Sequence, residues 1–141
     1  MWPSKYEDAL SEWYILRQTA TNLKNLEDSL HLINNWWAKA PMVNNLLHFA
    51  DYEDWPGPWD LLTFSGYCTV ATSMGICYTL LLLEHKDINR IQIVQTNIST
   101  VIHINDGQYI LNDERGDIMP SNDIQEILYS IDCEYFKNKI K

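Results

Sequence analysis

The feature that most constrains the fold is the long apolar segment 68–84, which begins at Cys68. Small residues dominate its first half, and the unbroken apolar run Leu80–Leu83 closes it. Strands rarely reach this length, and a helix that is apolar on all sides is a buried one. The segment therefore predicts a buried helix with Cys68 at its N-terminal end, where a nucleophilic thiol would lie.

The first third of the chain predicts two helices. Pro3 and Ser4 open the first, Ser4 and Glu7 are spaced as a capping box, and the helical pattern runs to about Thr19. The second is ended by Pro41 and has a broad apolar face made of Leu23, Leu26, Leu30, Ile33, Trp36 and Trp37. Residues 42–66 mix prolines, glycines and aromatic residues, so we expect a structured loop with short helical turns there.

After the long apolar segment, helical spacing gives way to alternation. Residues 90–96 and 100–105 alternate, and Asp106-Gly107 joins the second run to Gln108–Leu111, which is a strong hairpin signal. A last helix is predicted from Pro120-Ser121-Asn122-Asp123, with a buried stripe of Ile124, Ile127, Leu128 and Ile131. The predicted fold is α+β: N-terminal helices, a central Cys-bearing helix packed on a three-stranded antiparallel sheet, and a C-terminal helix.

Charge and hydropathy exclude some classes of binding partner. The chain has 141 residues, with 19 Asp and Glu against 10 Lys and Arg, giving a formal net charge of -9. No useful basic patch can be assembled from these residues, so we expect no nucleic-acid partner. The N-terminus lacks a signal-peptide pattern, and no apolar run is long enough to span a membrane. We expect a soluble, unexported cytoplasmic protein without a membrane partner.

The three cysteines indicate free thiols in a reducing compartment, because their number is odd and no Cys-x-x-Cys spacing occurs. We therefore expect no metal site and no cofactor. Cys77 would lie about half a turn around the helix from Cys68, so the two could not act as a pair. Cys133 is expected to serve in packing.

Several short motifs lie before and around Cys68. They are Ile33-Asn34-Asn35-Trp36, Asp54-Trp55, Pro58-Trp59-Asp60-Leu61-Leu62 and Gly66-Tyr67-Cys68. With the element order, they resemble the transglutaminase-like cysteine peptidase superfamily over roughly residues 30–115. The resemblance implies one transglutaminase-like domain with a papain-like core over residues 1–141, of which 1–40 form an N-terminal helical extension.

The same resemblance implies a catalytic site. In that family a Cys thiolate attacks an amide carbonyl, a His at the start of the second strand accepts the proton, and an Asp at the end of the third strand orients the imidazole. The candidates in this chain are Cys68, His103 and Asp113. Tyr67 departs from the family pattern, which has Asp before the Cys.

Strand parity tests this site. A two-residue turn at Asp106-Gly107 puts Ile102, Ile104, Tyr109 and Leu111 on the core face and turns His103 to the other face, away from Cys68. Asp113 would then lie on the core face opposite Thr100. An alternative alignment puts Asn112 at the carboxylate position. The three catalytic candidates are therefore predicted to be vestigial.

The leading functional hypothesis is a non-catalytic protein–protein interaction or assembly module, with interface anchors at Trp36, Trp37, Trp55 and Trp59. Two alternatives stay open: an active cysteine hydrolase or acyltransferase using Cys68, and an acidic inhibitor or DNA mimic. The segment Trp55-Pro56-Gly57-Pro58-Trp59, followed by Tyr67-Cys68, is similar to small proteins of tailed bacteriophages. That resemblance implies virion proteins as partners, and the host cytoplasm and virion as locations.

Overall fold

The fold is α+β, as predicted, in a computed structural model that describes residues 2–44, 46–113, 118 and 126–140. Helices α1 (Tyr6–Asn22) and α2 (Leu26–Trp37) come first, followed by a loop with the 3₁₀ helix η1 (Phe49–Asp54) and the short helix α3 (Pro58–Leu61). The long helix α4 spans Thr69–Leu83. Strands β1 (Ile91–Thr96), β2 (Thr100–Ile104), β3 (Tyr109–Leu111) and β4 (Ile127–Asp132) precede the 3₁₀ helix η2 (Cys133–Ile140).

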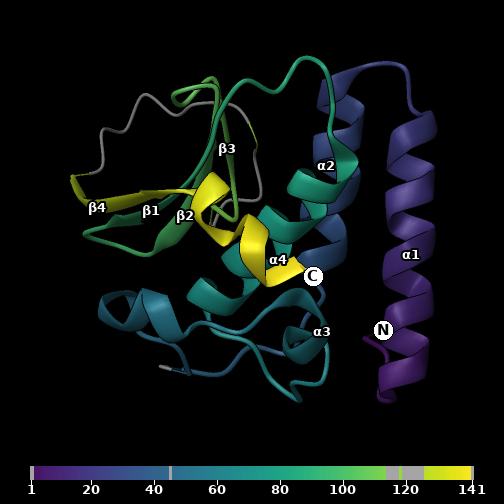
Figure 1. The fold of residues 1–141 in the computed structure, drawn as a ribbon, viewed down its shortest axis with the longest axis horizontal. Helices are drawn as coiled ribbons and strands as arrows, with labels where there is room; N and C mark the ends of the chain where they lie inside the picture. Colours follow the sequence, from purple (N-terminus) through teal and green to yellow (C-terminus); the bar gives the residue numbers. More distant parts are fainter. Residues whose placement is uncertain (1, 45, 114–117, 119–125, 141) are drawn as a thin grey trace.

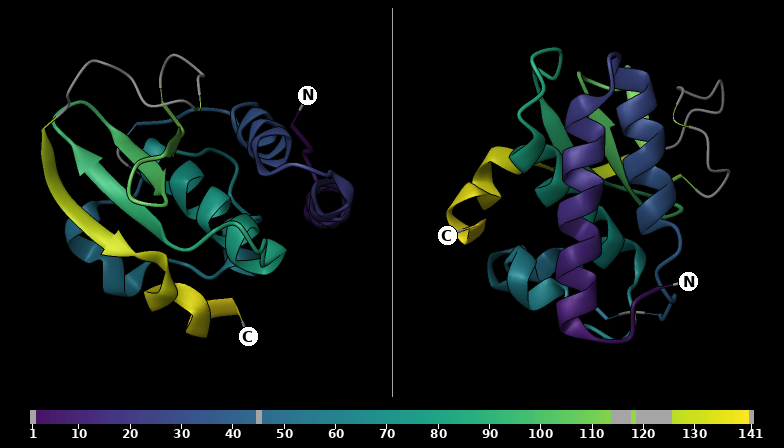
Figure 2. Two further views of the ribbon diagram at one scale, coloured as in Figure 1. Left: turned by 90° about the horizontal axis from the view of Figure 1, so that it is seen from above. Right: turned by 90° about the vertical axis from the view of Figure 1, so that its right-hand side faces the viewer.

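Helix α4 forms the middle of three layers, with the sheet on one side and helices α1 and α2 on the other (Figures 1 and 2). All of its residues from Val70 to Leu80 are buried, as its apolar sequence predicts. The sheet packs on α4 through Ile93, Ile102 and Ile104, which are fully buried. This arrangement places Cys68 at the N-terminal end of α4, where it is the N-cap residue.

A hydroxyl inside the core fixes the N-terminal helices to α4. The Oγ1 of Thr79 accepts hydrogen bonds from the indole N–H groups of Trp13 at 2.8 Å and Trp37 at 3.1 Å. It also donates to the carbonyl oxygen of Gly75 at 2.7 Å. Gly75 allows this approach, because an added Cβ there would lie 2.4 Å from the Trp37 ring. One residue of α4 therefore anchors both α1 and α2.

The hairpin register predicted from the turn is confirmed. Ile102 pairs with Leu111, His103 with Ile110, and Ile104 with Tyr109. The turn residues Asp106 and Gly107 have φ values of 61° and 97°, the left-handed backbone that a two-residue hairpin turn requires. The complete sheet has the order β3-β2-β1-β4 and is antiparallel at each pairing.

The predicted last helix is wrong over the residues that the structure describes. Ile127, Leu128 and Ile131 belong to strand β4, which pairs with β1 and is the fourth strand of the sheet. The predicted start of the helix at Pro120–Asp123, together with Ile124, lies outside the described residues. Helical conformation occurs only after the strand, in η2. Pairing with β1 overrides a residue spacing that fits a helix equally well.

The ends of the first two helices differ slightly from the prediction. The capping box at Ser4 and Glu7 is not formed, because α1 begins at Tyr6 and its N-cap Lys5 makes no side-chain cap. Helix α2 is capped by Asn25, whose side chain accepts a hydrogen bond from the Asp28 amide at 2.8 Å. Over the described parts of the chain, no helix combines the length and apolarity needed to cross a bilayer.

Candidate functional site

The thiol of Cys68 is paired with a peptide group rather than with a side chain. Its Sγ accepts a hydrogen bond from the Leu47 amide at 3.4 Å and lies 3.9 Å from the Leu47 carbonyl oxygen. The neighbouring backbone is held by a parallel bridge between Met42 and Tyr67. Cys68 is only 5% exposed. The thiol is therefore enclosed, with its recorded polar contacts made to the loop that precedes η1.

On the sheet side of the same helix end, the side chain of Asn112 binds several oxygens. Its Nδ2 lies 3.0 Å from the Thr69 carbonyl oxygen, 3.0 Å from Thr72 Oγ1, 2.9 Å from Ser73 Oγ and 3.2 Å from the Thr100 carbonyl oxygen. We call Asn34, Thr72, Ser73, Thr100 and Asn112 the Asn112 cluster. It joins α4 to the sheet through one amide.

The rest of the Asn112 cluster has its own partners. The backbone amide of Asn112 donates to Asn34 Oδ1 at 2.9 Å, and Ser73 Oγ donates to the Thr100 carbonyl oxygen at 3.2 Å. Thr100 Oγ1 donates to Gln95 Oε1 at 2.6 Å. Hydroxyl and amide groups are poor proton acceptors at neutral pH. The arrangement can hold elements together, but it supplies no general base.

The structure places His103 on the sheet face opposite α4. Its ladder neighbours Ile102 and Ile104 face the core, and successive strand residues point to opposite faces. The ring lies over the hairpin turn, with Nδ1 3.5 Å from the position of a Cβ added at Gly107. Burial lowers the pKa of His103, which favours its neutral form. The strand register therefore turns His103 to the face away from α4, as the hairpin turn predicts.

The prediction that Asp113 continues the third strand is wrong. Strand β3 ends at Leu111, and Asn112 has a left-handed backbone with φ of 67°. This turn breaks the alternation of faces, so Asp113 does not pair with Thr100 in the ladder. Asn112 takes that place with its side chain. The structure thus brings Cys68, Thr100 and Asn112 to one end of α4, while His103 lies on the other side of the sheet.

Sequence reasoning missed most of the Asn112 cluster, although a signal is present. Thr69, Thr72 and Ser73 recur at the helical spacing that aligns side chains along one face. A polar stripe on an otherwise apolar buried helix requires partners in the layer that it faces. Here the partners are Asn112 and Thr100.

The predicted tryptophan anchors fall into two groups. Trp37 and Trp55 are buried, with 1% and 2% exposure, so their prediction as surface anchors is wrong. Trp37 bonds to Thr79, and Trp55 stacks on Phe136 with ring centroids 5.5 Å apart. Trp36 is partly buried and Trp59 is 38% exposed. Only these last two remain available as anchors.

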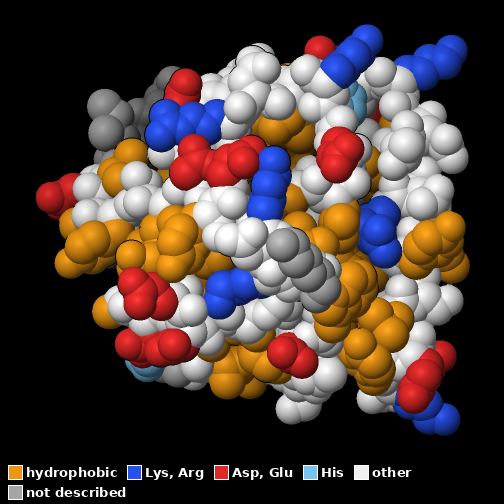
Figure 3. All heavy atoms as spheres, viewed as in Figure 1, with side chains coloured by type: hydrophobic (Ala, Val, Ile, Leu, Met, Phe, Trp, Pro, Cys, Tyr) orange, Lys and Arg blue, Asp and Glu red, His pale blue; other side chains and the backbone are white. Residues whose placement is uncertain are grey.

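A second feature is an open groove of about 640 Å³ beside the fourth strand, which we call the β4 groove. It is lined by Phe49, Ala50 and Tyr52 of η1, by Tyr129–Asp132 of β4 and by Tyr135 of η2. Figure 3 shows hydrophobic side chains gathered over β4 and η1, with acidic side chains close by. Exposed aromatic surface of this kind is typical of binding sites.

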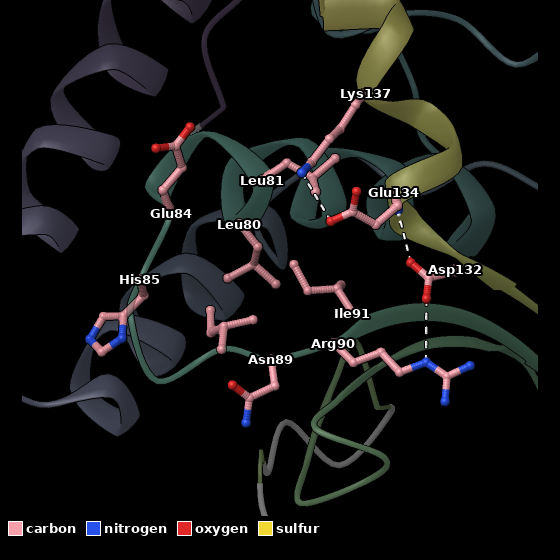
Figure 4. A pocket seen from close by; sticks show the side chains of 11 residues that line it. Leu80, Leu81, Glu84, His85, Asn89, Arg90, Ile91, Asp132, Glu134 and Lys137 are labelled. Atoms are coloured by element: carbon pink, nitrogen blue, oxygen red, sulfur yellow. Dashed lines mark hydrogen bonds and ion pairs between the residues drawn. The ribbon is translucent and has the colours of Figure 1, made fainter.

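A smaller hollow of about 270 Å³ lies between the C-terminal end of α4 and the start of η2 (Figure 4). Its two cationic side chains already have partners. Arg90 Nε lies 3.3 Å from Asp132 Oδ2, and Lys137 Nζ lies 2.9 Å from Glu134 Oε1. These pairs leave neither cation ready to bind an anionic ligand, so the hollow is the weaker candidate.

The chain gives no match when it is compared with protein-family models, with curated proteins or with solved structures.

Proposed function

We propose that this chain is a non-catalytic transglutaminase-like protein that acts as a protein–protein interaction or assembly module. The similarity of residues 55–68 to small bacteriophage proteins extends the proposal to a part of the virion as the assembly. The observation that carries the proposal is the Asn112 cluster. It fills the end of α4 beside Cys68 with hydroxyls and an amide, where the related enzymes need an imidazole and a carboxylate.

Three positions support the absence of catalysis. Thr100 begins β2, the place that the resemblance assigns to the catalytic His. Asn112 follows β3, the place that it assigns to the orienting Asp, and it uses its N–H groups as donors to neighbouring oxygens. His103 lies on the opposite face of the sheet. Within the described residues, the polar contacts of Cys68 Sγ are made to the Leu47 peptide group and not to an imidazole or a carboxylate, the proton acceptors that nucleophilic catalysis by a thiol uses.

The β4 groove supports the binding part of the proposal. Tyr129 and Tyr135 are 64% and 47% exposed, although Tyr129 lies next to partly buried Phe49 and Tyr135 next to buried Phe136. Tyrosine combines a large apolar surface with a hydroxyl and loses little conformational entropy on binding, which explains its enrichment in interfaces. Exposure of several such rings in one place is more than the fold itself requires.

One observation favours the alternative of an active cysteine hydrolase. The Cys68 sulfur lies at the N-terminal end of α4 and accepts a hydrogen bond from the Leu47 amide, and both features would stabilise a thiolate. A proton acceptor would still be needed. Measuring the reactivity of Cys68 separates the two functions.

The test is alkylation by iodoacetamide, followed at Cys68 by mass spectrometry of the derived peptides, in native and urea-unfolded protein. We expect native Cys68 to react at least about tenfold more slowly than the unfolded thiol at both pH 6 and pH 8, because it is enclosed and its described polar contacts are to a peptide group. Buried Cys77 serves as the internal control for global unfolding. Faster alkylation in the native protein at pH 6 would identify an activated nucleophile and reject the proposal.

A further inference from the structure

Strand β4 leaves one side of the sheet open. The order β3-β2-β1-β4 puts it at an edge, and Figure 2 shows it as the outermost strand. Within the described residues it pairs only with β1. Its sequence contains neither Lys nor Pro, the residues that commonly protect an edge strand from pairing. The register against β1 shifts between Ile127 and Tyr129, and such a bulge interrupts an edge, so the outward backbone groups able to pair with an added strand are those of Tyr129–Asp132.

The exposed rings beside this edge pack on partly buried and buried rings. Tyr129 stacks on Phe49 with ring centroids 5.9 Å apart, and Phe49 contacts buried Trp55 with ring centroids 5.4 Å apart. Tyr135 contacts buried Phe136 at 5.1 Å and Tyr52 at 5.4 Å. Rings that are fixed before binding lose little further freedom when a ligand packs on them. The β4 groove is therefore preorganised for apolar side chains.

The surroundings of the groove are acidic. Asp51, Glu53 and Asp54 on η1, and Glu126 just before β4, form no ion pair within the described parts of the chain. Of the nearby cations, Lys139 is bound to the carbonyl oxygens of Glu53 and Trp55, at 2.9 and 2.7 Å. Desolvation, and after it the carboxylate of Glu53, raise the pKa of Tyr135.

The same charges disfavour a second copy of the chain as the occupant. Antiparallel pairing of two β4 strands would bring Glu126 of one copy toward Asp132 of the other. Each copy also carries a formal charge of -9. Like charges placed close together in an interface oppose association. A cationic partner gains from the same field.

We propose that β4 and the β4 groove bind an extended, basic and apolar segment of a partner protein, which pairs with β4 as an additional strand of the sheet. Its alternate side chains would pack on Tyr129 and Tyr135, and its Lys or Arg residues would face the carboxylates of η1. This inference rests on the proposed function as an interaction module and names its surface and the chemistry of its partner.

The test is selection from a displayed library of random peptides longer than the six residues of β4, with the whole chain as bait. The selected peptides should place aliphatic or aromatic residues at alternate positions, carry Lys or Arg, and lack Pro, Asp and Glu. A bait with Tyr129→Ala and Tyr135→Ala should bind them at least about tenfold more weakly. The matched control is Tyr14→Ala, because Tyr14 is 55% exposed on the distant helix α1; this bait should bind them like the unchanged chain.

A synthetic copy of one selected peptide then tests strand pairing. N-methylation of every second amide should abolish binding in one of the two alternating sets and be tolerated in the other, because only one set of amides faces β4. Equal effects of both sets would overturn the proposal. Selection of Pro-rich or acidic peptides, retention by the Tyr129 and Tyr135 variant bait, or no selection at all would also overturn it.

Failure here and failure of the proposed function give different results. Peptide selection measures binding to β4 and the β4 groove, and it does not involve the Cys68 thiol. A fast-reacting Cys68 would reject the non-catalytic proposal whatever the peptides show. An empty selection with a slow-reacting Cys68 would reject only this surface and partner.

Discussion

The N-terminal end of α4 and the edge strand β4 differ in how many of their polar and apolar groups already have partners within the fold. At α4, the buried hydroxyls of Thr72 and Ser73 and the partly buried amide of Asn112 find partners inside the protein. At β4, the apolar side chains of Ile127 and Tyr129 are more than half exposed. At the N-terminal end of α4, the polar groups are already paired within the fold. At β4, the apolar side chains remain exposed to a ligand.

This difference indicates where a ligand can gain free energy. A substrate at Cys68 would have to displace the Leu47 peptide group and would meet donors and acceptors that are already paired. A partner at β4 would bury exposed rings and pair with backbone groups of an edge strand. Among the described residues, the surface that is open to a ligand therefore lies at β4 and not at Cys68.

The largest expected effect tests how firmly the closed interior depends on single hydroxyl groups. Thr79→Val keeps the shape of the side chain but leaves the indole N–H groups of Trp13 and Trp37 without an acceptor. At roughly 1–3 kcal/mol for each buried unpaired donor, we expect a loss of about 4 kcal/mol in the free energy of unfolding by urea. Thr79→Ser, which retains the hydroxyl, is the control. A loss under about 1 kcal/mol for the Val variant would contradict this account of the interior.

A somewhat smaller effect is expected when the amide of the Asn112 cluster becomes a carboxylate. In Asn112→Asp, an acceptor would face the oxygens of Thr69, Ser73 and Thr100. We expect a loss of about 3 kcal/mol in unfolding free energy near pH 7, and a smaller loss near pH 4, where a protonated carboxyl can donate. Chemical denaturation at the two pH values measures both.

The sign of this pH effect follows from proton binding. A carboxyl that is surrounded by oxygens has a folded-state pKa above its unfolded value of about 3.9, so stability falls as pH rises through the folded-state pKa. If the Asp variant were as stable as the unchanged chain at neutral pH, the cluster would accept a carboxylate. The Asn112 cluster could then hold a carboxylate, as a catalytic site does, and its polar groups would no longer argue against catalysis.

The smallest expected effect concerns His103, on the face of the sheet away from α4. Burial lowers its pKa in the folded state, so the unfolded chain binds the proton more readily. Its contribution to stability is therefore present above the unfolded pKa of about 6.5 and is lost as pH falls below it. We expect His103→Gln to flatten the fall in melting temperature between about pH 7 and pH 5. The same replacement at exposed His31 is the control. If melting temperature fell equally steeply with pH in the two variants, His103 would make no specific contribution to the pH dependence of stability.

The sequence was sufficient where structure is decided locally. Asp106-Gly107 adopts the left-handed backbone that its turn type needs, and this turn sets the register that places His103 away from α4. The apolar segment after Cys68 likewise predicts α4 from its own composition and length. The fold class and the orientation of one candidate catalytic residue follow from these two signals.

The sequence was insufficient where distant segments decide. Ile127, Leu128 and Ile131 fit a helix by spacing, and only the presence of β1 beside them makes a strand. Asn112 takes a left-handed backbone after the end of β3, so strand parity does not extend to Asp113. The aromatic partners of the β4 groove come from η1, β4 and η2, which are far apart in the chain.

Native-state hydrogen exchange of the backbone amides compares the two regions in one measurement. We predict that the amides of α4 and the Asn112 amide bonded to Asn34 exchange only through global unfolding, whereas the outward-facing amides of β4 exchange orders of magnitude faster. Protection of all β4 amides to the level of α4 would mean that the edge is already covered, and it would contradict the contrast between a closed interior and an open binding edge.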